Sequence, residues 1–202
     1  MTRLHLITHA HTAIDPAQDA TGWQLSATGQ RQAEALATLP FWANVDRILI
    51  SEEAKTRLTV APLLAQRALP VVSDRRFDEV QRPGWVEQYA EHVQAFFAAP
   101  QQTVGGWEPA AHALQRFLAG LRDHLPPDGD EEVALVSHGL VLSLYRAHLL
   151  GQAPPDFAAW RQLGFAAVAT VDLHTADLHA AAWINDFTPV AASPARAAPL
   201  DR

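Results

Sequence analysis

Leu4–Thr12, which reads LHLITHAHT, and Val133–Gly139, which reads VALVSHG, are the two stretches that decide the fold. In each, an apolar run leads to a histidine, His9 or His138, and a small residue comes next. Such a run predicts a buried parallel strand that delivers its last side chain to the carboxyl edge of the sheet, where open α/β sheets bind ligands. Two imidazoles at one edge predict a shared site. The alternative is that each histidine is an ordinary hydrogen-bonded residue at a strand end.

Short apolar runs alternate along the chain with longer segments of helical periodicity. This alternation predicts an α/β fold, a three-layer α/β/α sandwich around a mostly parallel sheet of about six strands. The expected strands are Leu4–Ile7, Arg47–Ile50, Val71–Ser73, Val133–Val136, Ala166–Asp172 and Leu178–Ile184. The expected helices are Ala27–Leu39, Ala54–Ala68, Val86–Ala98, Pro109–Leu125 and Leu140–Leu150. Pro62 should kink or interrupt the second helix, whereas Pro109 suits a first turn and Gly151 a C-terminal stop.

The length predicts one domain. A chain of 202 residues is long enough for one α/β domain with a full core, and we expect it to cover residues 1–187. Residues 84–108 are expected to form a small helical lid over the site. The large aromatic residues of this lid are expected to belong to the core: Tyr89, Phe96, Phe97 and Trp107. Residues 188–202, rich in Ala and Pro, are expected to form a flexible tail.

The composition is that of ordinary globular material, with 49% apolar residues, 18% charged residues and a net charge of −7. Nucleic acid and anionic membranes are not expected as partners, because both need a concentrated cationic face. No apolar run is long enough to cross a bilayer and the N-terminus lacks a targeting pattern, so a cytoplasmic location is expected. The absence of cysteine excludes disulfides, thiolate nucleophiles and Cys-ligated metals.

Six short blocks succeed one another along the chain. They are THA at Thr8–Ala10, LSATGQRQA at Leu25–Ala33, SEEAKTRLTV at Ser51–Val60, FDE at Phe77–Glu79, VSHG at Val136–Gly139 and WIND at Trp183–Asp186. In this order they resemble the RHG, LTxxGxxQA, SPLxRAxQTA, LxE, VSHG and ND blocks of the histidine phosphatase superfamily, in its phosphoglycerate-mutase-like branch. The resemblance runs from Leu4 to about Phe187 and so covers nearly the whole chain.

The resemblance implies metal-independent hydrolysis of a small phosphorylated molecule, with no cofactor. His9 corresponds to the nucleophile, whose neutral imidazole attacks phosphorus and gives a phosphohistidine that water hydrolyses. His138, beside Gly139 at the start of a helix, is expected to donate a hydrogen bond to the phosphoryl group near the positive helix end. Glu79 is expected to protonate the leaving alkoxide and then to activate water. No metal is required, because the imidazole accepts the phosphoryl group and cationic side chains replace magnesium.

The chain departs from the family in the cations that hold the phosphate. Thr8 stands where the family has an arginine before the nucleophile, and Lys55 replaces the second family arginine. A bidentate grip is therefore lost, and because a charge-assisted hydrogen bond is worth about 1.5–3 kcal/mol, low activity is expected. On this pattern Thr8→Arg should raise kcat/KM. His11 and Arg82 are candidate substitute cations.

Two acidic residues also stand at apolar family positions. Glu52 and Glu53 replace a proline and a leucine of the third block. Acids there suit a helix dipole but repel a nearby phosphate, so both are expected to face away from the site.

Other functions stay open beside hydrolysis. The missing arginine favours a catalytically impaired protein of the same fold that binds phosphorylated ligands or serves as a scaffold. The pair His9 and His11 is an HxH pattern, which favours a metal-dependent hydrolase if residues such as His138, Asp15 or Asp172 complete the ligand set. Mutase activity is less favoured than hydrolysis, because a mutase needs a closed pocket that keeps water from the phosphohistidine.

Overall fold

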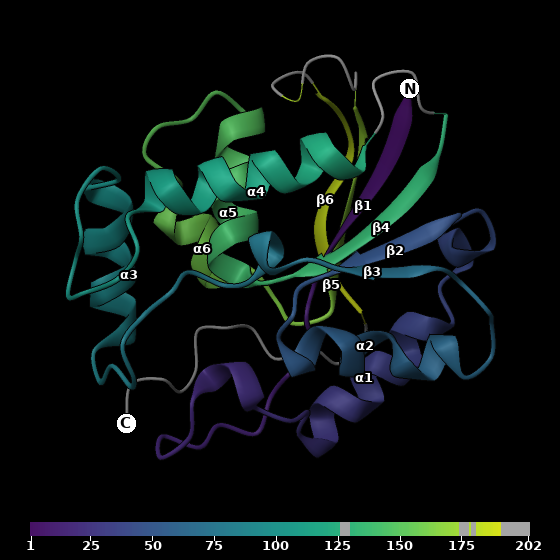
Figure 1. Ribbon diagram of the computed structural model, residues 1–202, viewed down its shortest axis with the longest axis horizontal. Coiled ribbons are helices and arrows are strands. Elements are labelled where there is room, and N and C mark those ends of the chain that lie inside the picture. The colour runs from purple at the N-terminus through teal and green to yellow at the C-terminus, as the bar shows by residue number, and fades with distance from the viewer. Residues whose placement is uncertain (126–129, 174–177, 179–180, 191–202) are drawn as a thin grey trace.

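The structure, a computed structural model, describes residues 1–125, 130–173, 178 and 181–190. Six strands form a single sheet in the order β3-β2-β4-β1-β5-β6 (Figure 1). Their bounds are β1 Thr2–Thr8, β2 Arg47–Ile50, β3 Val71–Ser73, β4 Glu132–Ser137, β5 Ala167–Leu173 and β6 Ala181–Pro189. The pairs β3–β2, β2–β4 and β4–β1 are parallel, whereas β5 runs antiparallel to both β1 and β6. The predicted mostly parallel six-stranded sheet is therefore confirmed.

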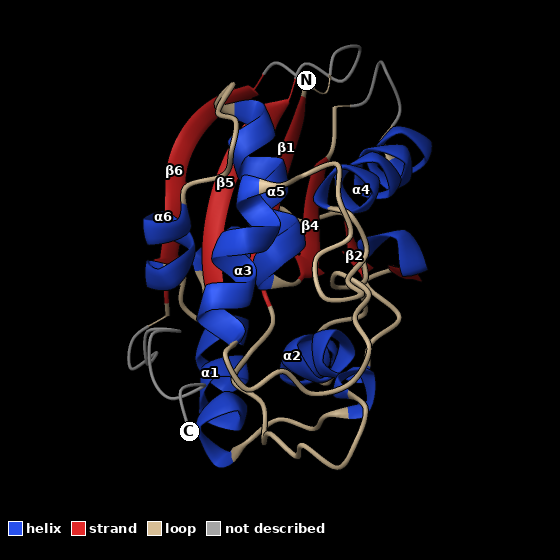
Figure 2. Cartoon of the chain, turned by 90° about the vertical axis from the view of Figure 1, so that its left-hand side faces the viewer, coloured by secondary structure: helices blue, strands red, loops and turns tan. Residues whose placement is uncertain are grey.

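Helices cover both faces of the sheet and give the predicted three layers. The helices are α1 Ala27–Ala37, α2 Ala54–Leu64, α3 Tyr89–Ala98, α4 Ala110–His124, α5 Gly139–Leu149 and α6 Phe157–Gln162. In Figure 1, α1 and α2 lie together on one side of the sheet, and α4, α5 and α6 lie on the other; in Figure 2, α1 and α2 again lie together, in the lower part of the view. Short 3-10 turns, η1 Ala20–Gly22, η2 Pro40–Ala43 and η3 Arg75–Phe77, connect these elements.

The two-residue periodicity of the strands builds a separate core on each face. Ile48 and Ile50 of β2 point to the cluster that holds α1 and α2, whereas Leu49 between them points to the cluster of α3, α4, α5 and α6. All three side chains are buried. Because side chains alternate across a strand, a continuous apolar run such as Ile48–Ile50 can bury side chains on both faces only where helices cover both faces of the sheet.

Most predicted elements exist, but several boundaries differ. The last strand begins at Ala181, later than expected, and continues through Thr188 and Pro189, which the sequence assigned to the tail. Residues 191–202 of the expected tail lie outside the described residues. Helix α2 passes through Pro62 without a break and ends two residues later. The short helix α6, whose first turn Asp156 caps through two amides, was not predicted.

The segment expected as a lid is anchored by its aromatic side chains. Phe96, Phe97 and Trp107 are buried in the core cluster of α4 and α5, as predicted, and Tyr89 is half-buried. The His92 ring lies so close to Gly105, whose φ is +55°, that a Cβ there would meet it at 2.1 Å. This turn therefore needs glycine for two reasons, the positive φ and the close approach.

No helix in the described part of the chain is both long and apolar enough to span a bilayer.

Candidate active site

Strand register brings the two predicted histidines together. Thr8 of β1 pairs with Ser137 of β4, so the next residues, His9 and His138, leave neighbouring strands at the same edge. The amide of His9 donates to the carbonyl of Ser137 at 2.9 Å. The centroids of the two imidazole rings are 5.2 Å apart. Parallel pairing of two remote segments is thus the feature that creates the site.

The backbone sets the tautomer of His9. Its Nδ1 lies 2.8 Å from the carbonyl oxygen of Ala10. Because a carbonyl oxygen only accepts, Nδ1 carries the hydrogen, and in the neutral ring the lone pair is on Nε2. The ring is 6% exposed and lies 5.5 Å from the ring of Phe165. An imidazole fixed in this way can act as a nucleophile through Nε2.

His138 caps helix α5 and is fully buried. Its Nε2 lies 2.8 Å from the hydroxyl oxygen of Ser51 and 3.5 Å from a carboxylate oxygen of Glu53. An anionic oxygen near Nε2 favours a hydrogen on that atom. Ser51 comes directly after β2, so this contact joins the ends of β2 and β4.

Glu79 occupies the N-terminus of helix α5. Its carboxylate accepts from the amides of Val80, Leu140 and Val141 at 3.1–3.2 Å. Leu140 and Val141 are in the first turn of the helix, where unpaired amides and the helix dipole attract an anion. The sequence assigned this helix end, with Gly139, to phosphate. In the structure the chain's own carboxylate holds these two amides, whereas a role of Gly139 itself toward phosphate stays a prediction.

Arg116, a residue that the sequence analysis missed, fixes the loop that carries Glu79. Its guanidinium donates to the carbonyls of Arg76, Asp78 and Glu79 at 2.8–2.9 Å and to the carboxylate of Glu108 at 2.9 and 3.0 Å. Arg116 lies on α4, far along the chain from this loop. No local sequence signal distinguishes it from an ordinary surface arginine of a helix.

The expectation for Glu53 is wrong, whereas Glu52 is exposed as predicted. Glu53 is 5% exposed and accepts from the amide of Glu79 at 2.8 Å. Its other oxygen forms an ion pair with the ammonium of Lys55, which also donates to the carbonyl of Ala20. A glutamate faces inward here because Lys55, two residues along the chain, gives it a buried partner.

Thr8 and His11, which the sequence assigned to phosphate binding, lie outside the lining of the cavity that contains His9. The hydroxyl of Thr8, fully buried, donates to the carbonyl of Gly164 and accepts from the amide of Ala167, both at 2.9 Å. It thus ties β1 to the segment before β5. The Nδ1 of His11 lies 2.8 Å from the hydroxyl of Ser26, the N-cap of α1. Neither side chain lines the cavity that contains His9.

Arg82 faces the cavity as a second cation. It donates to the hydroxyl of Tyr89 at 3.1 Å and lies over the rings of Tyr89 and Trp107 at 5.2 and 5.6 Å. Burial opposes its charge, but Tyr89, Glu79 and Glu53 raise the pKa of Arg82 above its usual value. Arg82 therefore stays cationic inside the site.

These side chains meet in one cavity of about 370 Å³, which contains His9, His138, Glu53, Lys55, Glu79 and Arg82. Asp78 also lines it, and burial raises the pKa of this carboxyl to about 6. Among the described residues, no three His, Asp or Glu side chains form a group that could hold a metal ion. The HxH pattern at His9 and His11 is thus not part of such a group.

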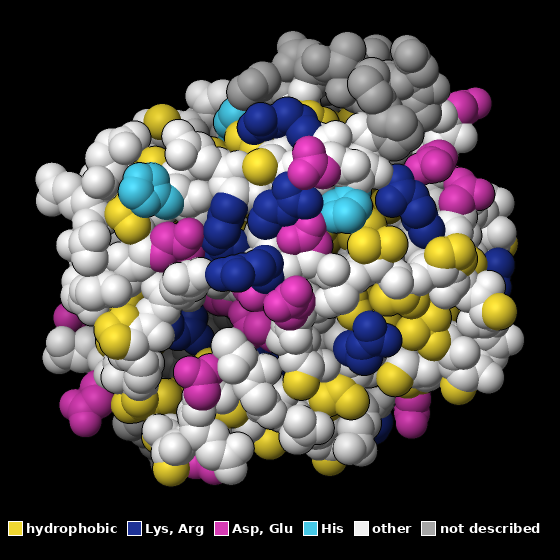
Figure 3. All heavy atoms as spheres, viewed as in Figure 1, with side chains coloured by type: hydrophobic (Ala, Val, Ile, Leu, Met, Phe, Trp, Pro, Cys, Tyr) yellow, Lys and Arg dark blue, Asp and Glu magenta, His cyan; other side chains and the backbone are white. Residues whose placement is uncertain are grey.

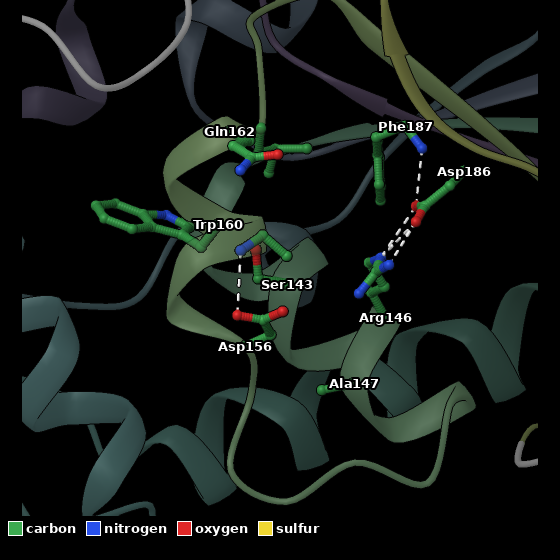
Figure 4. Close-up of a pocket in the computed structure, with 10 residues that line it drawn as sticks. Ser143, Arg146, Ala147, Asp156, Trp160, Gln162, Asp186 and Phe187 are labelled. Atoms are coloured by element: carbon green, nitrogen blue, oxygen red, sulfur yellow. Dashed lines mark hydrogen bonds and ion pairs between the residues drawn. The ribbon is translucent and has the colours of Figure 1, made fainter.

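A second cavity, of about 250 Å³, lies between α5, α6 and β6 and contains none of the predicted site residues. Its arginine, Arg146, donates to both carboxylate oxygens of Asp186 at 3.0 Å, and Trp160 points away from this pair (Figure 4). The charge of Arg146 is thus already balanced within the chain. On the face seen in Figure 3, basic and acidic side chains are interspersed around a hollow rather than gathered into one basic patch.

Comparison with known proteins identifies sequence relatives. The family model of the histidine phosphatase superfamily (branch 1) matches residues 4–186. Adenosylcobalamin/alpha-ribazole phosphatase of Escherichia coli is 28% identical over 173 residues, which cover 78% of this chain and 83% of that protein. A probable phosphoglycerate mutase of Yersinia enterocolitica is 25% identical over 199 residues, 91% of each chain.

Solved structures share the fold. YhfR of Bacillus stearothermophilus superposes with a TM-score of 0.74 at 18% identity and covers 92% of this chain and 96% of its own. A mycobacterial glucosyl-3-phosphoglycerate phosphatase superposes with a TM-score of 0.72 at 22% identity, covering 94% and 99%. At such identities the likeness supports the architecture alone.

Proposed function

Because the chain belongs to the histidine phosphatase superfamily, branch 1, we propose that it hydrolyses small phosphomonoesters through a phosphohistidine at His9, without a metal ion. The observation that carries the proposal is the pairing of His9 and His138, 5.2 Å apart, in a cavity that also holds Glu79. The sequence relatives also support phosphoryl chemistry, since one is a phosphatase and another a probable phosphoglycerate mutase.

The proposed first step is an in-line displacement. Nε2 of His9 forms a bond to phosphorus while the bond from phosphorus to the substrate oxygen breaks. Glu79, which must enter this step protonated although the helix end favours its carboxylate form, gives its proton to the departing oxygen. In the second step Glu79 takes a proton from water, whose oxygen attacks phosphorus and releases His9. The phosphoryl oxygens carry charge throughout, so Lys55, Arg82 and His138 act as the stabilising donors.

Phosphate must compete with the chain's own acids in this site. Lys55 already pairs with Glu53, and the hydroxyl of Thr8 is committed to the backbone. Lys55, which replaces the second family arginine and keeps its charge, is thus partly neutralised before substrate arrives. These observations favour slow turnover, and they also favour the second candidate function, a phospho-ligand-binding protein of the same fold with little or no catalysis.

The decisive experiment measures phosphate release from p-nitrophenyl phosphate and from a panel of sugar and glycerate phosphates. Wild type should release phosphate and His9→Ala should not, whereas His112→Ala, on the exposed side of α4, should behave as wild type. Quenching with alkaline detergent during turnover should trap a phosphoprotein that is stable to base and labile to acid, and His9→Ala should lack it.

Two results would overturn the hydrolase. Equal rates of phosphate release in wild type and His9→Ala over the whole panel would favour the phospho-ligand-binding protein. Calorimetry would then measure its affinity for inorganic phosphate. Loss of activity on dialysis against a chelator, restored by a divalent metal, would favour a metal-dependent hydrolase instead.

A further inference from the structure

Four half-buried aromatic rings line the cavity of His9. They are Trp23, Trp85, Tyr89 and Phe165. Trp23 comes after η1 and Trp85 precedes α3, yet their ring centroids lie only 6.3 Å apart, at an angle of 50°. Phe165 contributes from a distant part of the chain and lies 5.5 Å from the ring of His9. The aromatic wall therefore begins beside the attacking imidazole.

The exposure of these rings sets them apart from the core. Trp42 and Trp107 are 2% and 0% exposed and pack inside the apolar clusters, whereas Trp23 and Trp85 are half-buried and line the cavity, with the ammonium of Lys55 over the Trp23 ring at 5.9 Å. Large apolar rings left partly open in a concave site provide ligand contacts more often than stability. Their flat faces suit another flat ring, because aromatic pairs gain energy beyond the area that they bury.

The charges of the cavity argue against a second anion on the ligand. Asp19, Glu53, Asp78 and Glu79 line it, together with the cations Lys55 and Arg82. Lys55 is paired with Glu53, and Arg82 lies near Glu79 and Glu53. Among the described residues that line the cavity, two Lys or Arg side chains thus face four carboxyl groups, so the phosphoryl group occupies the positive charge of these two cations. A carboxylate or a second phosphate on the same molecule would meet repulsion.

We propose that this cavity selects phosphomonoesters whose alcohol carries a planar aromatic ring and no negative charge. The ring lies against Trp23 and Trp85, and the phosphoryl group lies between His9 and His138. This inference deepens the proposed function and rests on it for the presence of a phosphoryl group. It assigns to Trp85 and Trp23 the choice of substrate rather than any step of the chemistry.

Non-hydrolysable phosphonates test the selection without turnover. Calorimetry on the full chain compares benzylphosphonate with cyclohexylmethylphosphonate, which has a more apolar but non-aromatic ring. Benzylphosphonate should bind roughly 2- to 12-fold more tightly, the value of a ring pair. 4-Carboxybenzylphosphonate should bind about fivefold more weakly than benzylphosphonate, as expected for one added repulsion at close range. Equal or reversed preferences in either pair would overturn the proposal.

Variants place the preference on the named rings. Trp85→Leu should bring the ratio of the two affinities close to one, and Trp85→Phe should keep most of it. Trp183→Leu, which removes an indole on β6 outside the cavity, should leave the ratio unchanged. If Trp85→Leu loses its folded circular dichroism spectrum, Trp23→Leu replaces it. An unchanged ratio in a folded Trp85→Leu and a folded Trp23→Leu would contradict the assignment.

Kinetics separate this inference from the proposed function. Benzyl phosphate and cyclohexylmethyl phosphate both release a primary alkoxide, so leaving-group chemistry contributes little to the ratio of their kcat/KM values. Equal kcat/KM values that both depend on His9 would overturn the selection and leave the hydrolase intact. A preference among phosphonates without hydrolysis of any ester would overturn the hydrolase and leave the selection intact.

Discussion

The carboxylate of Glu53 forms an ion pair with the ammonium of Lys55 inside the cavity, and each side chain is only 5% exposed. The same carboxylate reaches within 3.5 Å of Nε2 of His138 and accepts from the amide of Glu79. Glu53 thus contacts two of the proposed phosphate donors, Lys55 and His138, and the backbone of the proposed acid, Glu79. Removal of one member of a buried pair leaves the charge of the other uncompensated, so a change at Glu53 should act on both stability and anion binding.

Glu53→Gln should strengthen the binding of inorganic phosphate by at least about fivefold, because it removes a negative charge from the site and releases Lys55. The amide oxygen of glutamine can still accept from the amide of Glu79. Calorimetry measures the change, and Glu52→Gln, the exposed neighbour, serves as the control. Weaker phosphate binding in a folded Glu53→Gln would mean instead that Glu53 holds Lys55 in the position that phosphate needs.

Anion binding should depend on pH through Asp78, whose pKa burial raises to about 6. Below that pH the carboxyl is neutral, and above it a negative charge is added to the cavity wall, so affinity should fall as pH rises. Sulfate is a suitable probe because its charge is constant across the pH range in which Asp78 titrates. Its inhibition constant should rise through about pH 6 in wild type. In Asp78→Asn this component should vanish.

Arg116→Met should lower the free energy of unfolding by about 2–4 kcal/mol, because three backbone carbonyls and Glu108 lose their donor. Since the loop of Glu79 is then released, kcat should fall more than KM changes. Urea denaturation and steady-state kinetics measure the two effects. Arg122→Met, an exposed change on the same helix, is the matched control. Equal stabilities of the two variants would contradict the role of Arg116.

The sequence predicted the helices and strands that follow from local hydrophobic periodicity, and it predicted that the two histidines at the strand ends share a site. His9 and His138 were found because each terminates an apolar run, and parallel pairing of two such runs leaves little freedom for the residues directly after them. The orientation of Glu53 could not be predicted in this way, because it depends on a partner, Lys55, in a buried setting. Arg116 and Thr8 act through backbone carbonyls and amides, which carry no sequence signal at all.

Thr8 provides the test of how far the family pattern transfers to this chain. The sequence alone predicts that Thr8→Arg restores a missing phosphate donor. In the structure the hydroxyl is fully buried and bridges the carbonyl of Gly164 and the amide of Ala167. An arginine there must displace this bridge and place a charge among groups that have no room for it. We therefore expect Thr8→Arg to lower stability and to leave kcat/KM no higher than in wild type.

The matched variant Thr8→Val keeps the shape of the side chain and removes only the hydroxyl. It should cost about 1–3 kcal/mol in the free energy of unfolding, because a buried amide and a buried carbonyl lose their partner. Phosphate affinity, corrected for the folded fraction, should not change, since the hydroxyl does not line the cavity. A loss of phosphate affinity in folded Thr8→Val, or a gain of kcat/KM in Thr8→Arg, would show that position 8 does reach the phosphate.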